Sequence, residues 1–228
     1  MRRVAFAGLC LALAILFAGL GIWQVERRAW KLDLIAKVEG RVHAAPSTLP
    51  PRDEWQGDNA YRRVRVTGTF LHDRETLVQA LTALGGGWWV LTPLQTQDGI
   101  ILVNRGYVPD DRRDRATRQA ALPTGPVTVT GLMRAPEPGG GFLRSNDPAA
   151  DRWFSRDVAA IARARQLGAT APFFIDADDT PNTGGYPVGG LTVISFRNNH
   201  LSYAVTWFAL ALLSVAGAVM VLRSGRRR

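Results

Sequence analysis

Val4–Trp23, with the sequence VAFAGLCLALAILFAGLGIW, contains no charged residue, and neither does Leu201–Leu222, with the sequence LSYAVTWFALALLSVAGAVMVL. A helix of about 18 or more apolar residues is long enough to cross the ~30 Å hydrocarbon core of a bilayer. The residues between these two segments have the composition of a water-soluble domain. The sequence therefore predicts a membrane protein of the α+β class, in which a two-helix transmembrane hairpin carries one folded domain.

The positions of the basic residues predict the orientation of this hairpin. The net charge is +9, but six of the 28 basic residues lie in the two terminal tails, at positions 2, 3, 223 and 226–228. The other basic residues exceed the 19 acidic ones by only three, so we expect no nucleic-acid partner. Positive flanks stay in the cytoplasm, whereas a long intervening domain crosses the membrane largely regardless of its charge. The six terminal arginines outweigh the competing cluster of Arg27, Arg28 and Lys31.

We therefore expect five parts along the chain. They are a cytoplasmic tail (1–3), a first transmembrane helix (4–24), a strand-rich periplasmic domain (25–200), a second transmembrane helix (201–222) and a basic cytoplasmic tail (223–228). The first apolar segment is longer than the ~7–15-residue core of a cleaved signal peptide, which indicates a retained anchor. A bacterial inner (plasma) membrane is the expected location, with the lipid bilayer in contact with both helices.

The middle of the chain is typical of a mostly antiparallel sheet or partial barrel. Apolar residues recur at three- and four-residue spacing from Trp23 to about Arg41, which predicts that the first helix continues beyond the membrane. After it, alternation of polar and apolar residues, or short apolar runs, predict strands. These strands are 63–67, 88–91, 99–103, 127–132, 173–175 and 191–196, and the last of them leads directly into the second span.

Three local signals refine this picture. The dipeptide Asp98-Gly99 predicts a hairpin turn. Pro93 predicts an edge strand or a bulge, since proline cannot donate a hydrogen bond to a neighbouring strand. Ser155 is a predicted cap for a short helix over Asp157–Gln166.

Motifs for catalysis and metal binding are scarce. The sequence contains no G-x-S-x-G, H-E-x-x-H or Walker-type loop. Asp176, Asp178 and Asp179 suggest a hard-cation loop, but Ca²⁺ requires about 6–8 oxygen ligands, and a solvated acidic turn is the preferred interpretation. We expect no enzymatic activity, and an anchored hydrolase that depends on His43 or His72 is the disfavoured alternative.

Polar side chains gather where the second span begins. Asn198, Asn199 and His200 precede it, and Tyr203 and Trp207 follow, so His200, Tyr203 and Trp207 share one helix face. Polar groups at membrane depth are costly unless they face protein, water or a ligand. Aromatic residues of the membrane interface explain part of this pattern. A neutral imidazole is also a common axial ligand of haem iron, and a helix-packing or partner-docking face explains the residues equally well.

Four short sequence blocks stand out, namely LGIWQVERRAWK (20–31), YRRV running to VTGTF (61–70), VNRGYVP (103–109) and NNHLSYA with TW (198–207). Together they resemble the Surfeit locus protein 1 family of cytochrome c oxidase assembly factors. The second-span block is similar to the family pattern N-N-H-L-x-Y-A-x-T-W. The third block is similar to V-N-R-G-W-V-P, with Tyr107 in place of the commoner tryptophan.

The resemblance implies a role in assembly of the haem-copper cytochrome c oxidase. Family members act on the catalytic subunit at the stage when haem a enters, which makes that subunit the expected partner and haem a the expected, transient cofactor. The family's proposed axial histidine corresponds to His200. Tyr203 and Trp207 would then shelter the macrocycle.

The remaining motif residues are expected partner contacts. Trp23, Gln24, Arg27 and Trp30 form either an interfacial anchor or a surface that faces His200, because both blocks lie at the same membrane depth. Asn198 and Asn199 belong to the same region. For Arg105 a structural role through an internal pair is favoured over contact with a propionate or a partner. The alternative function is a membrane docking scaffold for an oxidase subunit, without haem binding.

Overall fold

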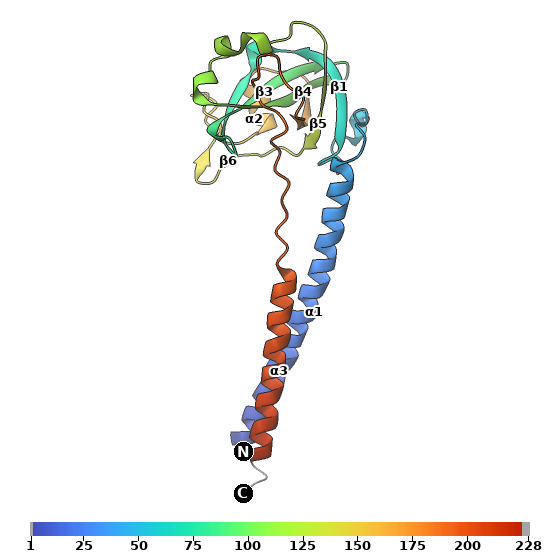
Figure 1. The fold of residues 1–228 in the computed structure, drawn as a ribbon, viewed down its shortest axis with the longest axis vertical. Coiled ribbons are helices and arrows are strands. Elements are labelled where there is room, and N and C mark those ends of the chain that lie inside the picture. Colours follow the sequence, from blue (N-terminus) through green and yellow to red (C-terminus); the bar gives the residue numbers. More distant parts are fainter. Residues whose placement is uncertain (1, 225–228) are drawn as a thin grey trace. The chain divides into compact units, whose positions relative to one another are not determined.

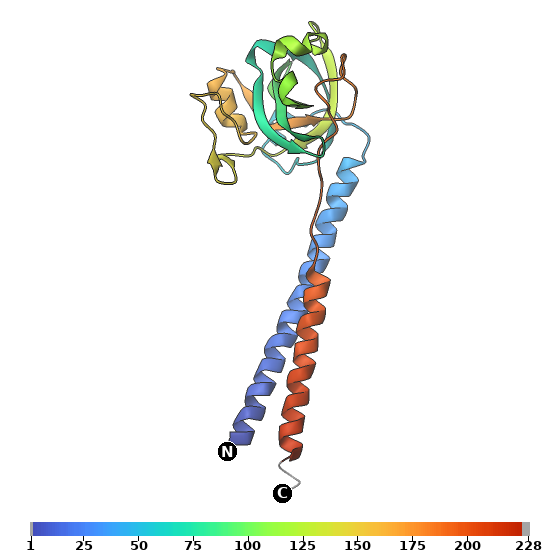
Figure 2. The same ribbon diagram turned by 60° about the vertical axis from the view of Figure 1, so that its left-hand side comes forward.

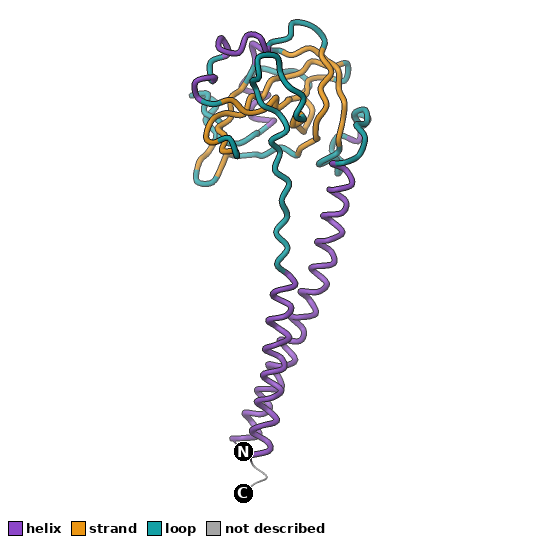
Figure 3. The backbone as a smooth tube through the Cα atoms, in the orientation of Figure 1, coloured by secondary structure: helices purple, strands orange, loops and turns teal. Residues whose placement is uncertain are grey.

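The computed structural model describes residues 2–224, and its contacts divide the chain into two units. The first unit combines the two ends of the chain, up to Glu39 and from Ile194 onward. The second unit is Gly40–Val193. The first is helical and the second is rich in strands, which agrees with the predicted α+β class (Figure 3).

The strand-rich unit is built on one curved sheet with the strand order β1-β5-β8-β4-β3-β2. β1 also pairs with β3 through Thr69–Gln95 and Phe70–Leu94, so five of the strands form a partial barrel (Figures 1 and 2). The β4–β8 pairing is parallel, and the other pairings in this sheet are antiparallel. The strands are β1 (Arg63–Phe70), β2 (Thr76–Thr82), β3 (Gly85–Thr96), β4 (Gly99–Val108), β5 (Val127–Arg134) and β8 (Thr170–Ala177).

A short hairpin, one α-helix and four 3₁₀ helices lie outside this sheet in the sequence of the strand-rich unit. A two-stranded hairpin, β6 (Gly140–Gly141) and β7 (Arg144–Ser145), precedes the helix α2 (Val158–Ala164). The 3₁₀ helices are η1 (Arg52–Glu54), η2 (His72–Arg74), η3 (Asp110–Arg112) and η4 (Arg115–Ala121).

The strands β4 and β8 are buried on both faces, which explains their apolar runs Ile100–Val103 and Phe173–Ile175. Successive side chains of a strand point to opposite faces. Ile101 and Val103 therefore join the cluster inside the barrel, whereas Leu102 joins an outer cluster against α2. β8 divides in the same way, with Phe173 facing inward and Phe174 outward.

Most of the predicted strands are confirmed, and one is wrong. The predicted segments 63–67, 88–91, 99–103, 127–132 and 173–175 lie in β1, β3, β4, β5 and β8, whereas β2 was not predicted. The predicted strand 191–196 is absent: residues 191–199 form an extended segment without strand pairing in the structure. The alternating pattern indicates which side chains of this segment are exposed, but it does not specify a strand with which the segment pairs.

The local signals had mixed outcomes. The β3–β4 turn consists of Gln97 and Asp98, with Gly99 at φ 122°, one residue earlier than Asp98-Gly99 predicts. β3 is an interior strand, but Pro93 lies beyond its last pairing with β2 at Leu91, where no donor is needed on that side. The helix α2 is capped by Asp157, whose carboxylate accepts from the Ala160 N–H, so the predicted cap at Ser155 is wrong.

The helical unit consists of two long apolar helices, α1 (Arg2–Val42) and α3 (His200–Ser224). Both are long and apolar enough to cross a membrane, judged by length and composition. The continuation of α1 beyond Trp23 to about Arg41 is confirmed. The helices run antiparallel, and most of their buried residues are small, which lets two backbones approach closely. The buried residues are Ala7, Ala14, Gly21, Gln24 and Val38 on α1 and Ala204 and Ala218 on α3.

Candidate functional site

A hydrogen bond between Gln24 and His200 connects the two long helices. Gln24 lies on α1 and is 9% exposed, and its Oε1 lies 2.7 Å from Nδ1 of His200, the first residue of α3. The two residues are 176 positions apart in the chain. The predicted surface that faces His200 thus includes Gln24.

The chemistry of this contact determines which nitrogen of His200 carries the proton. An amide oxygen only accepts hydrogen bonds, so Nδ1 of His200 is the donor. In the neutral imidazole, Nε2 then holds the free lone pair. This is the arrangement found around metal-ligating histidines, in which a hydrogen bond to one ring nitrogen fixes the tautomer and the ring orientation. His200 and Gln24 therefore fit the requirements of an axial ligand and its supporting acceptor.

A second contact lies on the same faces of the two helices. Phe17 of α1 and Trp207 of α3 stack with ring centroids 5.7 Å apart and an interplanar angle of 24°. Trp207 follows His200 by seven residues and Phe17 precedes Gln24 by seven, so the two contacts are two helical turns apart on both helices. Trp207 is thereby assigned to the interface between the helices.

The other predicted aromatic residues are exposed. Tyr203 is 55% exposed, although it lies only three residues from His200. Trp23 and Trp30 are also half exposed, and the guanidinium of Arg27 lies 4.0 Å from the ring centroid of Trp30. These residues are available to lipid or to a partner, whereas Gln24 is not.

The two asparagines before His200 differ in their environment. The Asn199 carbonyl accepts the N–H of Tyr203, at 3.3 Å, and so starts the hydrogen bonding of α3. Asn198 has a buried Oδ1 without a hydrogen-bond partner among the described residues. An unpaired buried acceptor costs free energy, which makes Asn198 a candidate for contact with a donor from another molecule.

Arg105 belongs to the strand-rich unit. It is 3% exposed and lies at the end of the barrel interior, where its guanidinium is 4.8 Å from the ring centroid of Phe70. One Nη2 hydrogen bond goes to the Ala121 carbonyl and another, of 2.9 Å, to Asn182 Oδ1. Burial lowers the pKa of Arg105 to about 10, although the charge of Glu75 opposes the shift.

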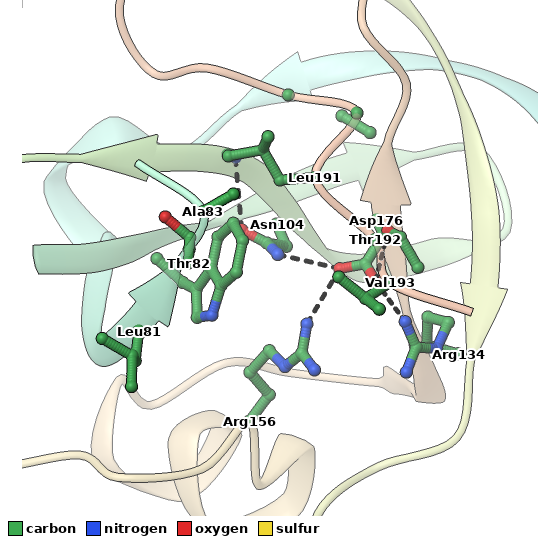
Figure 4. Close-up of a pocket in the computed structure, with 15 residues that line it drawn as sticks. Leu81, Thr82, Ala83, Asn104, Arg134, Arg156, Asp176, Leu191, Thr192 and Val193 are labelled. Carbon is green, nitrogen blue, oxygen red and sulfur yellow. Dashed lines mark hydrogen bonds and ion pairs between the residues drawn. The ribbon is translucent and has the colours of Figure 1, made fainter. Parts of the chain in front are cut away.

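A polar cluster around Asp176 was not predicted as a unit. Asp176 is 4% exposed and lies at the edge of a cavity of about 470 Å³ (Figure 4). Figure 4 shows side chains that converge on its carboxylate from the strands β4 and β5 and from two loops. The donors are Arg134 Nη1 (2.6 Å), Asn104 Nδ2 (2.8 Å), Thr192 Oγ1 (3.0 Å) and Arg156 Nη1 (3.1 Å).

The charges of this cluster are balanced. Arg156 also binds Glu137, so two arginines face two carboxylates. Burial alone lowers the pKa of Arg156, but the hydrogen bonds and charges of Glu137 and Asp176 outweigh it and raise the pKa above its ordinary value. Burial alone raises the pKa of Glu137, but its hydrogen bonds with Arg156 hold the pKa below the ordinary value. A network with complete pairing is suited to structural support.

The interpretation of Asp176, Asp178 and Asp179 as a solvated acidic turn holds only for the last of them. Asp176 is buried, and Asp178 pairs with Arg63 at 3.6 Å and accepts from Thr180. Asp179 is exposed. Within residues 2–224, no group of three or more His, Cys, Asp or Glu side chains is arranged to hold a metal ion.

Comparisons with known proteins cover nearly the whole chain. The model of the SURF1 family matches residues 11–212, which include Gln24 and His200. Surfeit locus protein 1 of Homo sapiens is 39% identical over 211 residues, 85% of this chain and 69% of the human protein. The protein of the same name from Rattus norvegicus is 38% identical over 84% of this chain and 67% of its own length. A SURF1-like protein of Monosiga brevicollis is 36% identical over 96% of this chain and 88% of its own length.

Proposed function

The chain belongs to the SURF1 family, and from that premise we propose that it is an assembly factor for the haem-copper cytochrome c oxidase. It aids the insertion of haem a into the catalytic subunit, or stabilises that subunit until the haem is in place. The chain acts by binding, without catalysing a reaction. The similarity to Surfeit locus protein 1 over most of the chain supports the family role.

The observation that carries the haem contact is the hydrogen bond of Gln24 with His200. Because Gln24 accepts the Nδ1 proton, the imidazole presents an unprotonated Nε2, the atom that ligates haem iron. Haem a supplies a redox-active iron in a largely apolar macrocycle, which is best kept out of water. Tyr203, exposed beside His200, would cover the macrocycle, and Trp207 would fix the spacing of the helices through Phe17.

The setting we propose is a bacterial inner membrane. α1 and α3 cross it as a hairpin, both termini lie in the cytoplasm, and the strand-rich unit lies in the periplasm. The length and apolar composition of both helices support this arrangement, as do the arginines that flank them. His200, Trp23 and Trp30 then lie near the outer surface of the membrane.

The assembly role is tested by comparing membranes of a strain that lacks this chain with those of its parent. We expect the a-type haem band of the reduced-minus-oxidised spectrum to fall together with oxidase activity, while the b- and c-type bands persist. Identical spectra in the two strains would refute the assembly role for this chain.

The haem contact is tested separately by returning His200→Ala or Leu201→Ala to the deletion strain. Leu201 is the neighbouring, exposed residue of the same helix and serves as the matched control. We expect L201A to restore the a-type band and H200A to fail, with equal amounts of both chains in the membrane. If H200A restores the oxidase and the purified wild-type chain shows no haem absorption, the function is that of a docking scaffold that does not bind haem.

A further inference from the structure

A small cavity at one end of the barrel contains a buried arginine that has no carboxylate partner within residues 2–224. The cavity is about 150 Å³, and Arg105 lines it together with Phe70, Val103 and Asn182. Exposed Thr128, Thr180 and Pro181 form part of its wall, so solvent reaches the rim. Arg105 itself is only 3% exposed.

The hydrogen bonding of Arg105 is incomplete. Nη2 is satisfied by the Ala121 carbonyl and by Asn182 Oδ1, but the buried Nη1 has no hydrogen-bond partner in the described part of the chain. A guanidinium offers five N–H donors in a planar fork that fits a carboxylate with two parallel hydrogen bonds. Because Nη2 already makes two hydrogen bonds, Nη1 is the donor of this cavity-lining arginine that remains for an anion.

The charge around Arg105 is not neutralised by the described residues. Glu75 is the acidic group whose charge acts on it, but the Glu75 carboxylate is already bound by Arg118, at 2.8 Å. Asp178 lines the same cavity, and its carboxylate is directed to Arg63 and Thr180. A buried charge without a partner destabilises the folded state. Arg105 is therefore a buried cation whose nearby carboxylates, Glu75 and Asp178, already bind other side chains.

We propose that the barrel end is a binding site for a single carboxylate group, held by Arg105 and flanked by Asn182. A volume of 150 Å³ admits one carboxylate with a short aliphatic stem and excludes a nucleotide or a sugar phosphate. The carboxylate comes either from an acidic side chain of a partner polypeptide or from a free small acid. The site lies in the strand-rich unit and does not depend on the proposed haem contact.

The test uses the full chain in detergent and follows thermal unfolding by tryptophan fluorescence. The probe is sodium acetate, compared with sodium chloride at the same ionic strength. A ligand that binds only the folded state at ten times its Kd raises Tm by about 3–6 °C for a domain of this size. We expect that rise with acetate and not with chloride.

Two aspartate substitutions at neighbouring positions make the test specific. Asn182→Asp places a carboxylate next to the Arg105 guanidinium, where Asn182 Oδ1 now lies 2.9 Å from Nη2, and should abolish the response to acetate. Thr183→Asp, at the exposed next residue, adds the same charge without this contact and should keep the full response. An equal response of N182D and T183D, or no response of the wild-type chain, would overturn the site.

Saturation-transfer NMR with acetate provides a readout that does not depend on unfolding. Signal transfer to the acetate methyl group is expected with the wild-type chain and T183D, and is lost in N182D. A capped dipeptide with an aspartate side chain identifies the source. If this peptide binds at a lower concentration than acetate does, the carboxylate comes from a partner polypeptide. If acetate binds and the peptide does not, the carboxylate comes from a free small acid. Absence of transfer with either probe refutes the proposal.

Discussion

Gln24 shows how a single side chain determines the chemistry of another one on a distant helix. Its amide oxygen accepts the Nδ1 proton of His200 and leaves Nε2 free. Loss of such a supporting partner typically lowers metal affinity by about 10–100-fold. The same residue is almost fully buried, so it also belongs to the packing of α1 against α3.

We therefore predict that Gln24→Ala lowers the amount of a-type haem in membranes while the chain remains stably present. The neighbouring Ile22→Ala is the control, because Ile22 is 55% exposed and has no role in the contact. The reduced-minus-oxidised spectrum and an immunoblot of the same membranes measure both quantities. Equal a-type bands in Q24A and I22A would show that the hydrogen bond does not serve haem binding.

His72 is a residue whose titration affects the stability of the strand-rich unit near neutral pH. Burial lowers its pKa below 6.5, and the hydrogen bond of Nε2 with the Pro123 carbonyl opposes this shift only partly. The unfolded chain then binds the proton more tightly than the folded one. The contribution of neutral His72 to stability is complete above pH 6.5 and is lost as the pH falls toward the lower, folded-state pKa.

We predict that the free energy of unfolding decreases from pH 7 to pH 5 in the wild-type chain and decreases less in His72→Gln. Glu137 does not interfere in this range, because its lowered pKa places its effect below about pH 4.5. Denaturant titrations at pH 5, 6 and 7, followed by tryptophan fluorescence, measure the difference. Parallel pH profiles for the two proteins would contradict the assignment to His72.

At the scale of elements, the close approach of α1 and α3 depends on small residues at specific positions. A Cβ added at Gly21 would lie 2.6–2.8 Å from ring atoms of Phe208 on α3. A Cβ added at Gly19 meets nothing within 4 Å. The two glycines are two residues apart on α1, so one faces α3 and the other does not.

We predict that Gly21→Leu separates the helices and that Gly19→Leu does not. Cys10 is the only cysteine, so a Cys10→Ser chain with Gln24→Cys and His200→Cys carries one reporter pair. The yield of cross-linking with a short bifunctional thiol reagent should fall several-fold in the G21L background and persist in the G19L background. Equal yields in both backgrounds would argue against packing through Gly21.

Gly106 performs a comparable function in the strand-rich unit. It has φ 129°, and an added Cβ would lie 2.1 Å from the Val188 carbonyl oxygen. This close approach permits the paired hydrogen bonds between Tyr107 and Val188, each 2.9 Å. The residues Asn104–Tyr107 thus combine a hydrogen-bond donor to Asp176, a buried cation and a pairing point for the segment after β8.

At the scale of the whole molecule, the arginines at both ends predict the membrane topology. We expect a C-terminal fusion of alkaline phosphatase to be inactive, because this enzyme is active only in the periplasm. An insertion of the same enzyme between Phe142 and Leu143, at the exposed tip of the β6–β7 hairpin, should be active. High activity of the C-terminal fusion would refute cytoplasmic termini.

Periodicity along the chain determined the local elements. The uncharged runs specify two long helices, and alternation specifies most strands, because both signals report which faces are buried. His200 and Gln24 were recognised in another way, because they stand in short blocks that resemble the Surfeit locus protein 1 family. The local pattern did not distinguish buried Gln24 from exposed Trp23 beside it.

Only the tertiary structure decided which of these elements meet. The parallel β4–β8 pairing, the closure of β1 on β3 and the Asp176 cluster join segments far apart in sequence, and a burial pattern carries no information on the partner. The segment 191–196 has the pattern of a strand but no strand to pair with, so it remains extended and unpaired. The unpaired nitrogen of Arg105 likewise became evident only when every neighbouring carboxylate had been placed. Hydrogen-bond partners are a property of three-dimensional proximity, and for that physical reason the sequence alone does not specify them.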